Sequence, residues 1–391
     1  MNGGNWQSNY QGRIAGHNQD DDYGQVSYGQ NGQEQRPYGL SQVSGQQGFG
    51  GNPSSKETRR IAYTEGGKYK KSSGGMVSMK ISAANIGGMQ CAKEFSEHKS
   101  RVNSLNYSTD GMHMISSSDD ESIVLYNCDS GTKTRTLNSK KYGVDLIHFS
   151  HNVTDAIHCS TKVDDTIRYL SLHDNKYIRY FGGHQKKVIT LAMSPIDDTF
   201  ISSSLDRSIR LWDLRSPNCQ GLMQLQHKAI AAFDPEGLIF AAGVNSDHIK
   251  LYDLRSYDKG PFATFQLEQE AHCEWTSMKF SPNGKQILMC TNGEHMKLVD
   301  SFTGNITYEL KGHKNAKRQP LEATFSPDSN FVFCGSSDNQ IYSWSTETGN
   351  IAATLSTTHG AFFQQVAFNP RYYVLASACT NVFFWVPSED E

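Results

Sequence analysis

Histidine, serine and aspartate recur in this sequence at spacings that a hydrolytic site could use. Two sets stand out, and each ends at a tryptophan: His184, Ser202 or Ser203, Asp206 and Trp212, then His313, Ser336, Asp338 and Trp344. In a serine hydrolase, histidine takes the serine proton and the carboxylate orients the imidazole. An active site is needed once, whereas this set occurs at least twice. The repetition therefore predicts a structural role, in which each buried polar group finds a partner inside one repeat unit.

Outside these two sets the sequence offers little that could do chemistry. A partial set keeps His98 and Asp120 but has Tyr126 in the place of the tryptophan. The other repeats lack the set, so we expect apolar packing to hold them together. There is no glycine-rich phosphate loop, and no His/Cys/carboxylate group has metal-ligand spacing. The sequence predicts no enzyme, no metal and no cofactor.

The sets stand at a fixed place in a repeating unit built from strands. From about residue 90, runs rich in Val, Ile, Phe and Tyr alternate with turns of Asp, Gly, Asn and Ser. Each unit contains Ile-x-Leu-Trp-Asp or a variant on its third strand. We call one residue of this motif the anchor, and the anchors are Tyr126, Leu170, Trp212, Tyr252, Val299, Trp344 and Trp385. The anchors lie 40 to 47 residues apart, which is the period of a four-stranded WD40 propeller blade. Seven anchors predict an all-β, seven-bladed WD40 propeller.

The ends of the repeat region indicate how the ring closes. Only six residues follow Trp385, so the seventh blade lacks its outermost strand. Residues 91–95 are predicted to form a spare strand just before His98. This strand has the same place relative to His98 as an outermost strand has relative to His184. We expect this N-terminal strand to complete the seventh blade, which leaves no unpaired sheet edge there.

The first part of the chain differs in composition. Residues 1–75 are rich in Gly, Gln and Asn and end in a basic stretch, so they are predicted to be disordered, because little apolar surface is available to offset the ordering entropy. The tail is either a self-associating segment or a solvated one, and its basic end is either a nuclear-localisation signal or a solvated linker. Residues 76–89 are expected to be a linker, and residues 90–391 the propeller.

Bulk composition bounds the partners and the compartment. The net charge is -3 and the pI about 6.5, which indicates no polyanionic partner and no sequence-specific nucleic acid. The eight cysteines include no Cys-x-x-Cys pair, as expected for reduced thiols in a core. With no leader and no run of 18 apolar residues, we expect a soluble, intracellular protein without a membrane contact.

A basic arc is predicted where the chain enters the first three blades. It comprises Arg101, Lys140, Lys141, Lys186 and Lys187, with Tyr142 beside them. Adjacent blades converge at the mouth of the central channel, so these cations should be neighbours. Such an arc suits an acidic or phosphorylated peptide. The alternative is an ordinary solvated rim.

Two arginines carry a second candidate interaction. Arg215 and Arg255 end the motifs Trp-Asp-Leu-Arg and Tyr-Asp-Leu-Arg on consecutive blades. This double motif resembles that of propellers that serve cullin-type ubiquitin ligases as substrate receptors, whose arginines dock on the ligase adaptor. Alternatively, the two arginines satisfy nearby carboxylates or carbonyl groups at the strand ends.

Several long stretches are more specific than the repeat pattern. They span residues 116–126, 139–147, 164–181, 209–223 and 233–245. They closely resemble the Swd-two-type WD-repeat subunit of COMPASS, the SET-domain complex that methylates histone H3. The resemblance runs from about residue 95 to 387, weakens in blades five to seven and excludes the tail. In WD-repeat propellers in general, the aspartate of the recurring His, Ser, Asp and Trp set holds the histidine ring, and the tryptophan forms a hydrogen bond with the second strand.

The resemblance implies a non-catalytic nuclear scaffold. Its expected partners are the SET-domain methyltransferase, other subunits of that complex, and the phosphorylated C-terminal tail of RNA polymerase II. Relatives also occur in a protein phosphatase complex and in the polyadenylation machinery, so a role in transcription termination is a further expectation. A substrate receptor of a cullin-type ubiquitin ligase remains the alternative function.

Overall fold

The computed structural model describes residues 80–268, 270, 273–356 and 362–388 of the 391-residue chain. The tail predicted for residues 1–75 and the first residues of the expected linker lie outside the described part. Among the described residues, no helix combines the length and hydropathy that crossing a membrane requires.

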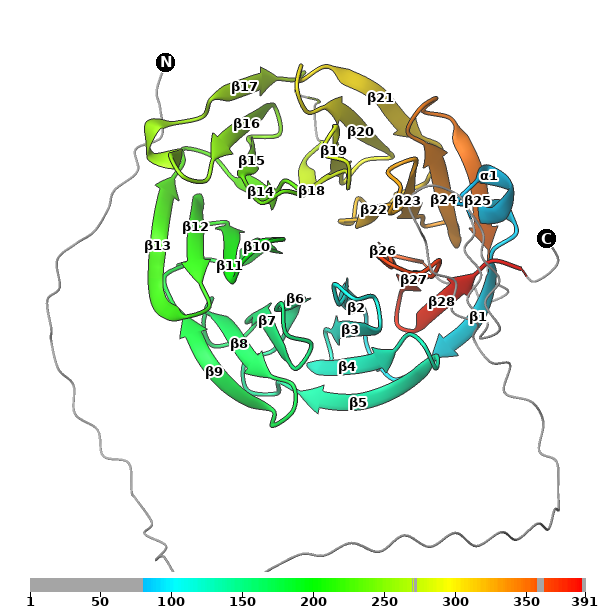
Figure 1. The fold of residues 1–391 in the computed structure, drawn as a ribbon, viewed down its shortest axis with the longest axis horizontal. Helices are drawn as coiled ribbons and strands as arrows, with labels where there is room; N and C mark the ends of the chain where they lie inside the picture. Colours follow the sequence, from blue (N-terminus) through cyan, green and yellow to red (C-terminus); the bar gives the residue numbers. More distant parts are fainter. Residues whose placement is uncertain (1–79, 269, 271–272, 357–361, 389–391) are drawn as a thin grey trace, which may run out of the picture. The chain divides into compact units, whose positions relative to one another are not determined.

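Seven antiparallel sheets of four strands stand in a ring (Figure 1). The first three blades comprise β2 (Val102–Tyr107), β3 (His113–Ser118), β4 (Ser122–Asn127) and β5 (Thr132–Asn138); β6 (Asp145–Phe149), β7 (Asp155–Cys159), β8 (Ile167–Ser171) and β9 (Lys176–Phe181); and β10 (Val188–Met193), β11 (Thr199–Ser204), β12 (Ser208–Asp213) and β13 (Ser216–Gln224). In each of these blades the chain runs from the innermost strand outward.

Blades four to six repeat this order. They comprise β14 (Ala229–Phe233), β15 (Ile239–Val244), β16 (His248–Asp253) and β17 (Ala263–Gln266); β18 (Trp275–Phe280), β19 (Gln286–Thr291), β20 (His295–Asp300) and β21 (Ile306–Lys311); and β22 (Ala323–Phe325), β23 (Phe331–Gly335), β24 (Gln340–Ser345) and β25 (Ile351–Ser356). A short 3-10 helix, η1 (Tyr257–Lys259), precedes β17. The seven-bladed propeller predicted from the anchor spacing is confirmed.

Burial follows the position of each strand within its blade. The second strands are almost wholly buried, as in β15 and β23, whereas the outermost strands are the most exposed, as in β5 and β9. The apolar clusters lie between neighbouring blades. Ile201 of blade three, for example, packs in one cluster with Phe240 and Tyr252 of blade four. The ring is therefore held by sheet-against-sheet packing rather than by one central core.

The seventh blade is closed by the N-terminal strand, as predicted. It contains β26 (Gln365–Phe368), β27 (Leu375–Ala378), β28 (Val382–Val386) and, outermost, β1 (Gln90–Phe95). Gln90 pairs with Val386 and Phe95 with Val382. The Asn381 side chain donates a hydrogen bond of 2.7 Å to Glu94 Oε1.

A short helix precedes the closing strand. Helix α1 (Ala83–Gly87) begins at Ser82, whose side chain accepts a hydrogen bond from the Asn85 N–H, and it packs against β25 (Figure 1). Ile86 and Met89 are buried in the cluster that contains Trp385 of blade seven. Residues 80–89, part of the expected linker, are thus packed on the propeller in the structure.

Candidate peptide-binding face

One face of the propeller carries the loops that enter the innermost strands, and we name it the top face. Each of these loops lies beside the hairpin that joins the second and third strands of the blade it enters. In blade one the Asp119 N–H donates to the Arg101 carbonyl group (2.9 Å), and in blade three Leu205 donates to Lys187 (3.0 Å). The recurring His, Ser and Asp residues lie between loop and hairpin on this face.

Blade three contains the complete network. His184 Nδ1 lies 2.9 Å from Asp206 Oδ2, and His184 Nε2 lies 2.7 Å from Ser202 Oγ. Trp212 Nε1 donates to the same Ser202 oxygen at 2.8 Å. Because the Asp206 carboxylate can only accept, the proton of the His184 ring lies on Nδ1, and Nε2 accepts from the Ser202 hydroxyl, whose oxygen accepts from Trp212. Burial alone would raise the pKa of Asp206, but hydrogen bonds from His184, Ser208 and the Gln185 N–H lower it well below its usual value.

This geometry resembles a hydrolytic triad but closes it to any substrate. Ser202 is fully buried, and Trp212 is packed against its oxygen. A nucleophile must reach a substrate carbon atom, and the Ser202 side chain has no surface exposed to solvent. What the arrangement can do is clamp the loop that enters the blade to the blade's own hairpin.

Blade one contains a version of the network with tyrosine in the tryptophan position. His98 Nε2 lies 2.7 Å from Ser116 Oγ, and His98 Nδ1 lies 2.6 Å from Ser122 Oγ. Tyr126 reaches the same Ser116 oxygen at 3.3 Å. Burial opposes ionisation of Asp120, but hydrogen bonds from Ser122 and from the Lys99 N–H lower its pKa to about 2.

Blade six departs from the expected network, and its residues are a correction to the sequence analysis. Ser336 accepts from the Lys314 N–H at 2.8 Å, Asp338 accepts from the Tyr342 hydroxyl at 2.8 Å, and Trp344 donates to the Lys311 carbonyl at 2.9 Å. Neither His313 Nδ1 nor Asp338 Oδ1 has a partner within the described residues. Burial lowers the pKa of His313 to about 4.

The cause is one substitution on the second strand of blade six. Cys334 pairs across the strands with the residue two positions before Trp344. Ser202 pairs in the same way with the residue two positions before Trp212, so Cys334 holds the place of Ser202. A thiol is a weak hydrogen-bond acceptor. The sulfur therefore does not bridge tryptophan and histidine, and Trp344 turns to a backbone carbonyl group.

The predicted basic arc lies on the top face, but two of its five cations are paired. Arg101 Nε lies 3.0 Å from Asp119, and Lys187 Nζ lies 3.1 Å from Asp145. Within the described residues, no carboxylate contacts the ammonium groups of the remaining three, Lys140, Lys141 and Lys186. These three lysines are exposed. We name them the free lysine set.

A buried arginine, Arg168, lies beneath Tyr142 and supports the middle of the arc. It was not among the residues predicted from the sequence. The Arg168 guanidinium lies 3.5 Å from the centre of the Tyr142 ring, while Lys141 Nζ approaches the same ring at 5.0 Å. Arg168 is 2% exposed and pairs with Asp164 at 2.8 Å. Hydrogen bonding to Arg168 lowers the pKa of Asp164 to about 2. The stack fixes Tyr142 and so fixes the loop that carries Lys140 and Lys141.

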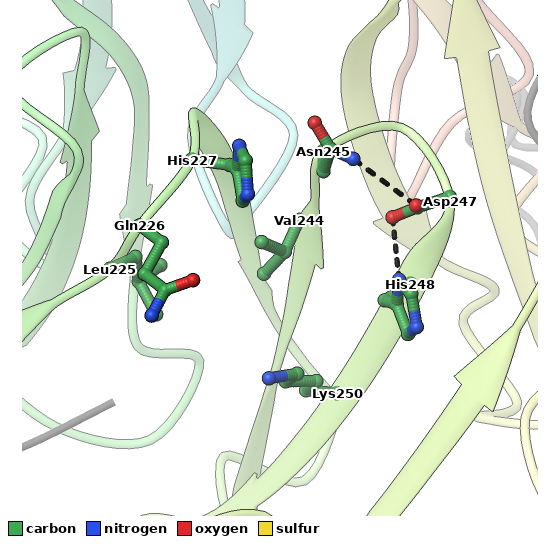
Figure 2. A pocket seen from close by; sticks show the side chains of 8 residues that line it. All are labelled: Leu225, Gln226, His227, Val244, Asn245, Asp247, His248 and Lys250. Carbon is green, nitrogen blue, oxygen red and sulfur yellow. Dashed lines mark hydrogen bonds and ion pairs between the residues drawn. The ribbon is translucent and has the colours of Figure 1, made fainter. Parts of the chain in front are cut away.

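A hollow on the top face of blade four adds a second polar site (Figure 2). The loop that enters this blade has four residues, 225–228, against six in blade three, 182–187. The shorter loop leaves a space of about 280 Å³ lined by Leu225, Gln226, His227, Val244, Asn245, Asp247, His248 and Lys250. Asp247 is held by His248 (2.5 Å) and Asn245 (3.1 Å). Lys250 contacts no carboxylate in the described part of the chain, so this space can accept an acidic group.

Arg215 and Arg255 lie on the opposite face, after the strands that run away from the top face. The Arg215 side chain donates three hydrogen bonds to Asp213, at 2.9, 3.2 and 2.7 Å, although it is 74% exposed. Arg255 is exposed, and its side chain has no partner among the described residues. A partner on these arginines would not compete with one on the basic arc.

The comparisons with known proteins agree with this architecture. The family described as WD domain, G-beta repeat matches residues 89–127, 175–213 and 304–345. The chain is 57% identical over 315 residues to WD repeat-containing protein 82 of Drosophila melanogaster, covering 81% of this chain and 99% of the relative. It is 33% identical to COMPASS component SWD2 of Saccharomyces cerevisiae, covering 80% of this chain and all of that relative.

The chain belongs to the SWD2 family of WD-repeat proteins. A further relative, Set1 complex component swd2 of Schizosaccharomyces pombe, is 35% identical over 330 residues and is covered to 92% of its length. The family resemblance expected from the sequence is confirmed. The similarity spans 92% or more of the length of each of these relatives, so it extends beyond the three matched repeat segments.

Proposed function

We propose that this protein is a non-catalytic scaffold subunit of a chromatin-modifying histone H3 lysine methyltransferase complex and acts in the nucleus. The observation that carries the proposal is its identity to COMPASS component SWD2 and Set1 complex component swd2 over nearly their full lengths. The closed Ser202–His184–Asp206 network supports the non-catalytic part, because it is built to hold a blade together. Its direct partners are then the SET-domain methyltransferase and other subunits of that complex.

The basic arc gives the proposal a second partner. We propose that the free lysine set and Tyr142 bind an acidic or phosphorylated peptide, with the phosphorylated C-terminal tail of RNA polymerase II as the expected source. Three exposed ammonium groups without carboxylate partners support this, since each can form a charge-assisted bond with a phosphate. Association with a protein phosphatase or polyadenylation complex, and a part in transcription termination, rest on the family resemblance.

The alternative is a substrate receptor of a cullin-type ubiquitin ligase that docks through Arg215 and Arg255. The exposed Arg255 side chain is compatible with docking. Arg215, in contrast, already has a local carboxylate partner in Asp213. None of the three relatives described above is named as part of a ligase, so this alternative has less support.

Affinity purification followed by mass spectrometry tests the proposal. We expect the full chain to co-purify with SET-domain methyltransferase subunits. An Arg215→Ala/Arg255→Ala variant is the matched control, and it should retain these partners. Recovery of a cullin and its adaptor in place of methyltransferase subunits, lost in the double variant, would overturn the scaffold proposal and favour the ligase.

A further inference from the structure

Blade five brings together three side chains that no sequence motif connects. Glu270 and Cys273 lie in the loop between β17 and β18, and His295 begins β20. Glu270 Oε2 lies 2.9 Å from His295 Nε2, and Cys273 Sγ lies 3.9 Å from that nitrogen. The three possible ligand atoms lie within 4.8 Å of one another. Glu270 and Cys273 line a hollow of about 290 Å³.

The cluster occupies the place of the His–Ser–Asp network in blade three. When blades three and five are aligned on their anchors, His295 aligns with Ser208, and Gly293 aligns with Asp206. In blade three the loop supplies the histidine and the hairpin supplies the acid. In blade five the loop supplies an acid and a thiol, and the hairpin supplies the histidine. The thiol has no counterpart in the ordinary network, so a simple exchange of clamp residues does not account for it.

Two neighbours shape the space among the three groups. A Cβ on Gly293 would lie 3.3 Å from Cys273 Sγ and 3.5 Å from His295 Cε1, so the glycine keeps the volume beside both ligands open. Lys297, 3% exposed, contacts Glu270 Oε1 at 2.5 Å. That contact holds the carboxylate so that its other oxygen, Oε2, faces the histidine.

We propose that Glu270 Oε2, Cys273 Sγ and His295 Nε2 bind one divalent transition-metal ion of the zinc class. Thiolate, imidazole and carboxylate are the ligands of zinc, and three of them leave a fourth position for water. A thiolate and a carboxylate supply two negative charges, of which the carboxylate charge is shared between the ion and Lys297. Calcium and magnesium prefer sites made of oxygen alone.

Binding moves protons in a defined way. The Cys273 thiol must lose its proton to solvent, because the thiolate is the metal ligand. The His295 proton that now lies between Nε2 and Glu270 must leave Nε2, so the bound imidazole is neutral with its proton on Nδ1. The ion then replaces a hydrogen bond with three coordination bonds and joins the loop to the hairpin of blade five.

Cobalt(II) titration of the tag-free, reduced full chain tests the site, because cobalt substitutes for zinc and reports a thiolate ligand by a charge-transfer absorption band. We expect the wild type to develop this band and Cys273→Ser to lose it. Cys219→Ser, which removes a partly exposed thiol in blade three, should keep it. Gly293→Ala keeps all three ligands but fills the space between two of them, and its binding should weaken at least about 10-fold, as disturbed metal surroundings usually do.

A second measurement separates binding from folding. Zinc should raise the melting temperature of the wild type and of Cys219→Ser, because it binds the folded state, and should leave Cys273→Ser unchanged. Equal melting temperatures in a chelator would show that these variants fold. Absence of the band in the folded wild type, or its persistence in Cys273→Ser, would overturn the proposal and leave the cluster as a clamp of hydrogen bonds.

Discussion

His184 and Asp206 meet at 2.9 Å between the loop that enters blade three and the hairpin of the same blade. Their contact is the centre of a network in which Ser202 also bonds Trp212. Both side chains are largely covered, with exposed fractions of 0% and 11%. A change at this contact therefore reports on the stability of the blade rather than on partner binding.

We predict that His184→Ala lowers the free energy of unfolding by about 1–3 kcal/mol, because Asp206 and Ser202 lose a buried hydrogen-bond partner. Denaturant titration measures the effect. His313→Ala is the matched control in blade six, and it should cost less through hydrogen bonding, since His313 makes no bond to Asp338 in the described structure. Lost binding of partners by a His184→Ala protein of unchanged stability would contradict the structural role.

The closing strand makes a second prediction. Deleting residues 1–79 should leave the melting temperature unchanged, because it keeps helix α1 and every described strand. Deleting residues 1–89 removes buried Ile86 and Met89 and should lower it. Deleting residues 1–95 also removes β1, which opens the seventh blade and exposes a sheet edge prone to aggregation. Equal melting temperatures for the first and third truncations would refute closure by β1.

Buried histidines predict a pH dependence of stability. Burial lowers the pKa of His158 to about 4, while an unfolded histidine titrates near 6.5. Between these values the unfolded chain binds a proton that the folded chain does not, so stability falls as the pH drops from about 6.5 to 4. The slope from one such group is at most about 1.4 kcal/mol per pH unit.

Replacing the buried histidine should flatten this dependence. We expect the unfolding free energy of His158→Gln to change less than that of the wild type between about pH 7 and pH 5, a range that covers the upper part of the titration window. His173→Gln, which alters a side chain 82% exposed, should keep the wild-type dependence. Denaturant midpoints at both pH values give the comparison, and identical slopes for wild type and His158→Gln would refute the assignment.

The basic arc yields the fourth prediction. Reversing the free lysine set, Lys140, Lys141 and Lys186, to glutamate should weaken binding of a phosphorylated polymerase-tail peptide by at least about 10-fold. Exposed pairs contribute only about 0.2–1 kcal/mol each, so several must act together, and binding should fall with salt. Lys187 is left intact because Asp145 already pairs with it.

The control reverses the same number of charges elsewhere. Lys176, Lys259 and Lys285 are exposed in loops and strand ends of the opposite face. Their triple reversal changes the net charge equally and should leave peptide affinity almost unchanged at physiological salt. Similar weakening by both triples would mean that bulk charge governs binding, and the arc would then be an ordinary solvated rim.

The fold followed from the sequence because its information is local and periodic. Each anchor marks a third strand, and the six residues after Trp385 are too few for a fourth, so the closing strand could be inferred. Blade six was harder to predict. Its network depends on Cys334, whose place opposite the third strand appears only when the strands are paired residue by residue.

The candidate sites depended more on contacts between distant residues. Nothing in the sequence places Arg168 beneath Tyr142, or pairs Lys187 with Asp145 across two blades. The blade-five cluster was missed because Glu270, Cys273 and His295 follow no known ligand spacing. A shortened loop, as in blade four, is visible in the sequence, but the space it leaves depends on the side chains around it.

The pairing of β1 with β28 also bears on how the protein is made on the ribosome. Glu94 and Asn381, which bond in the closed ring, are 287 positions apart. Strand β1 leaves the ribosome early and must wait, unpaired, until almost the whole chain has been synthesised. Such distant pairing slows folding and prolongs exposure of a strand edge. We therefore expect the yield of closed protein to depend on how long β1 stays unpaired before β28 has been synthesised.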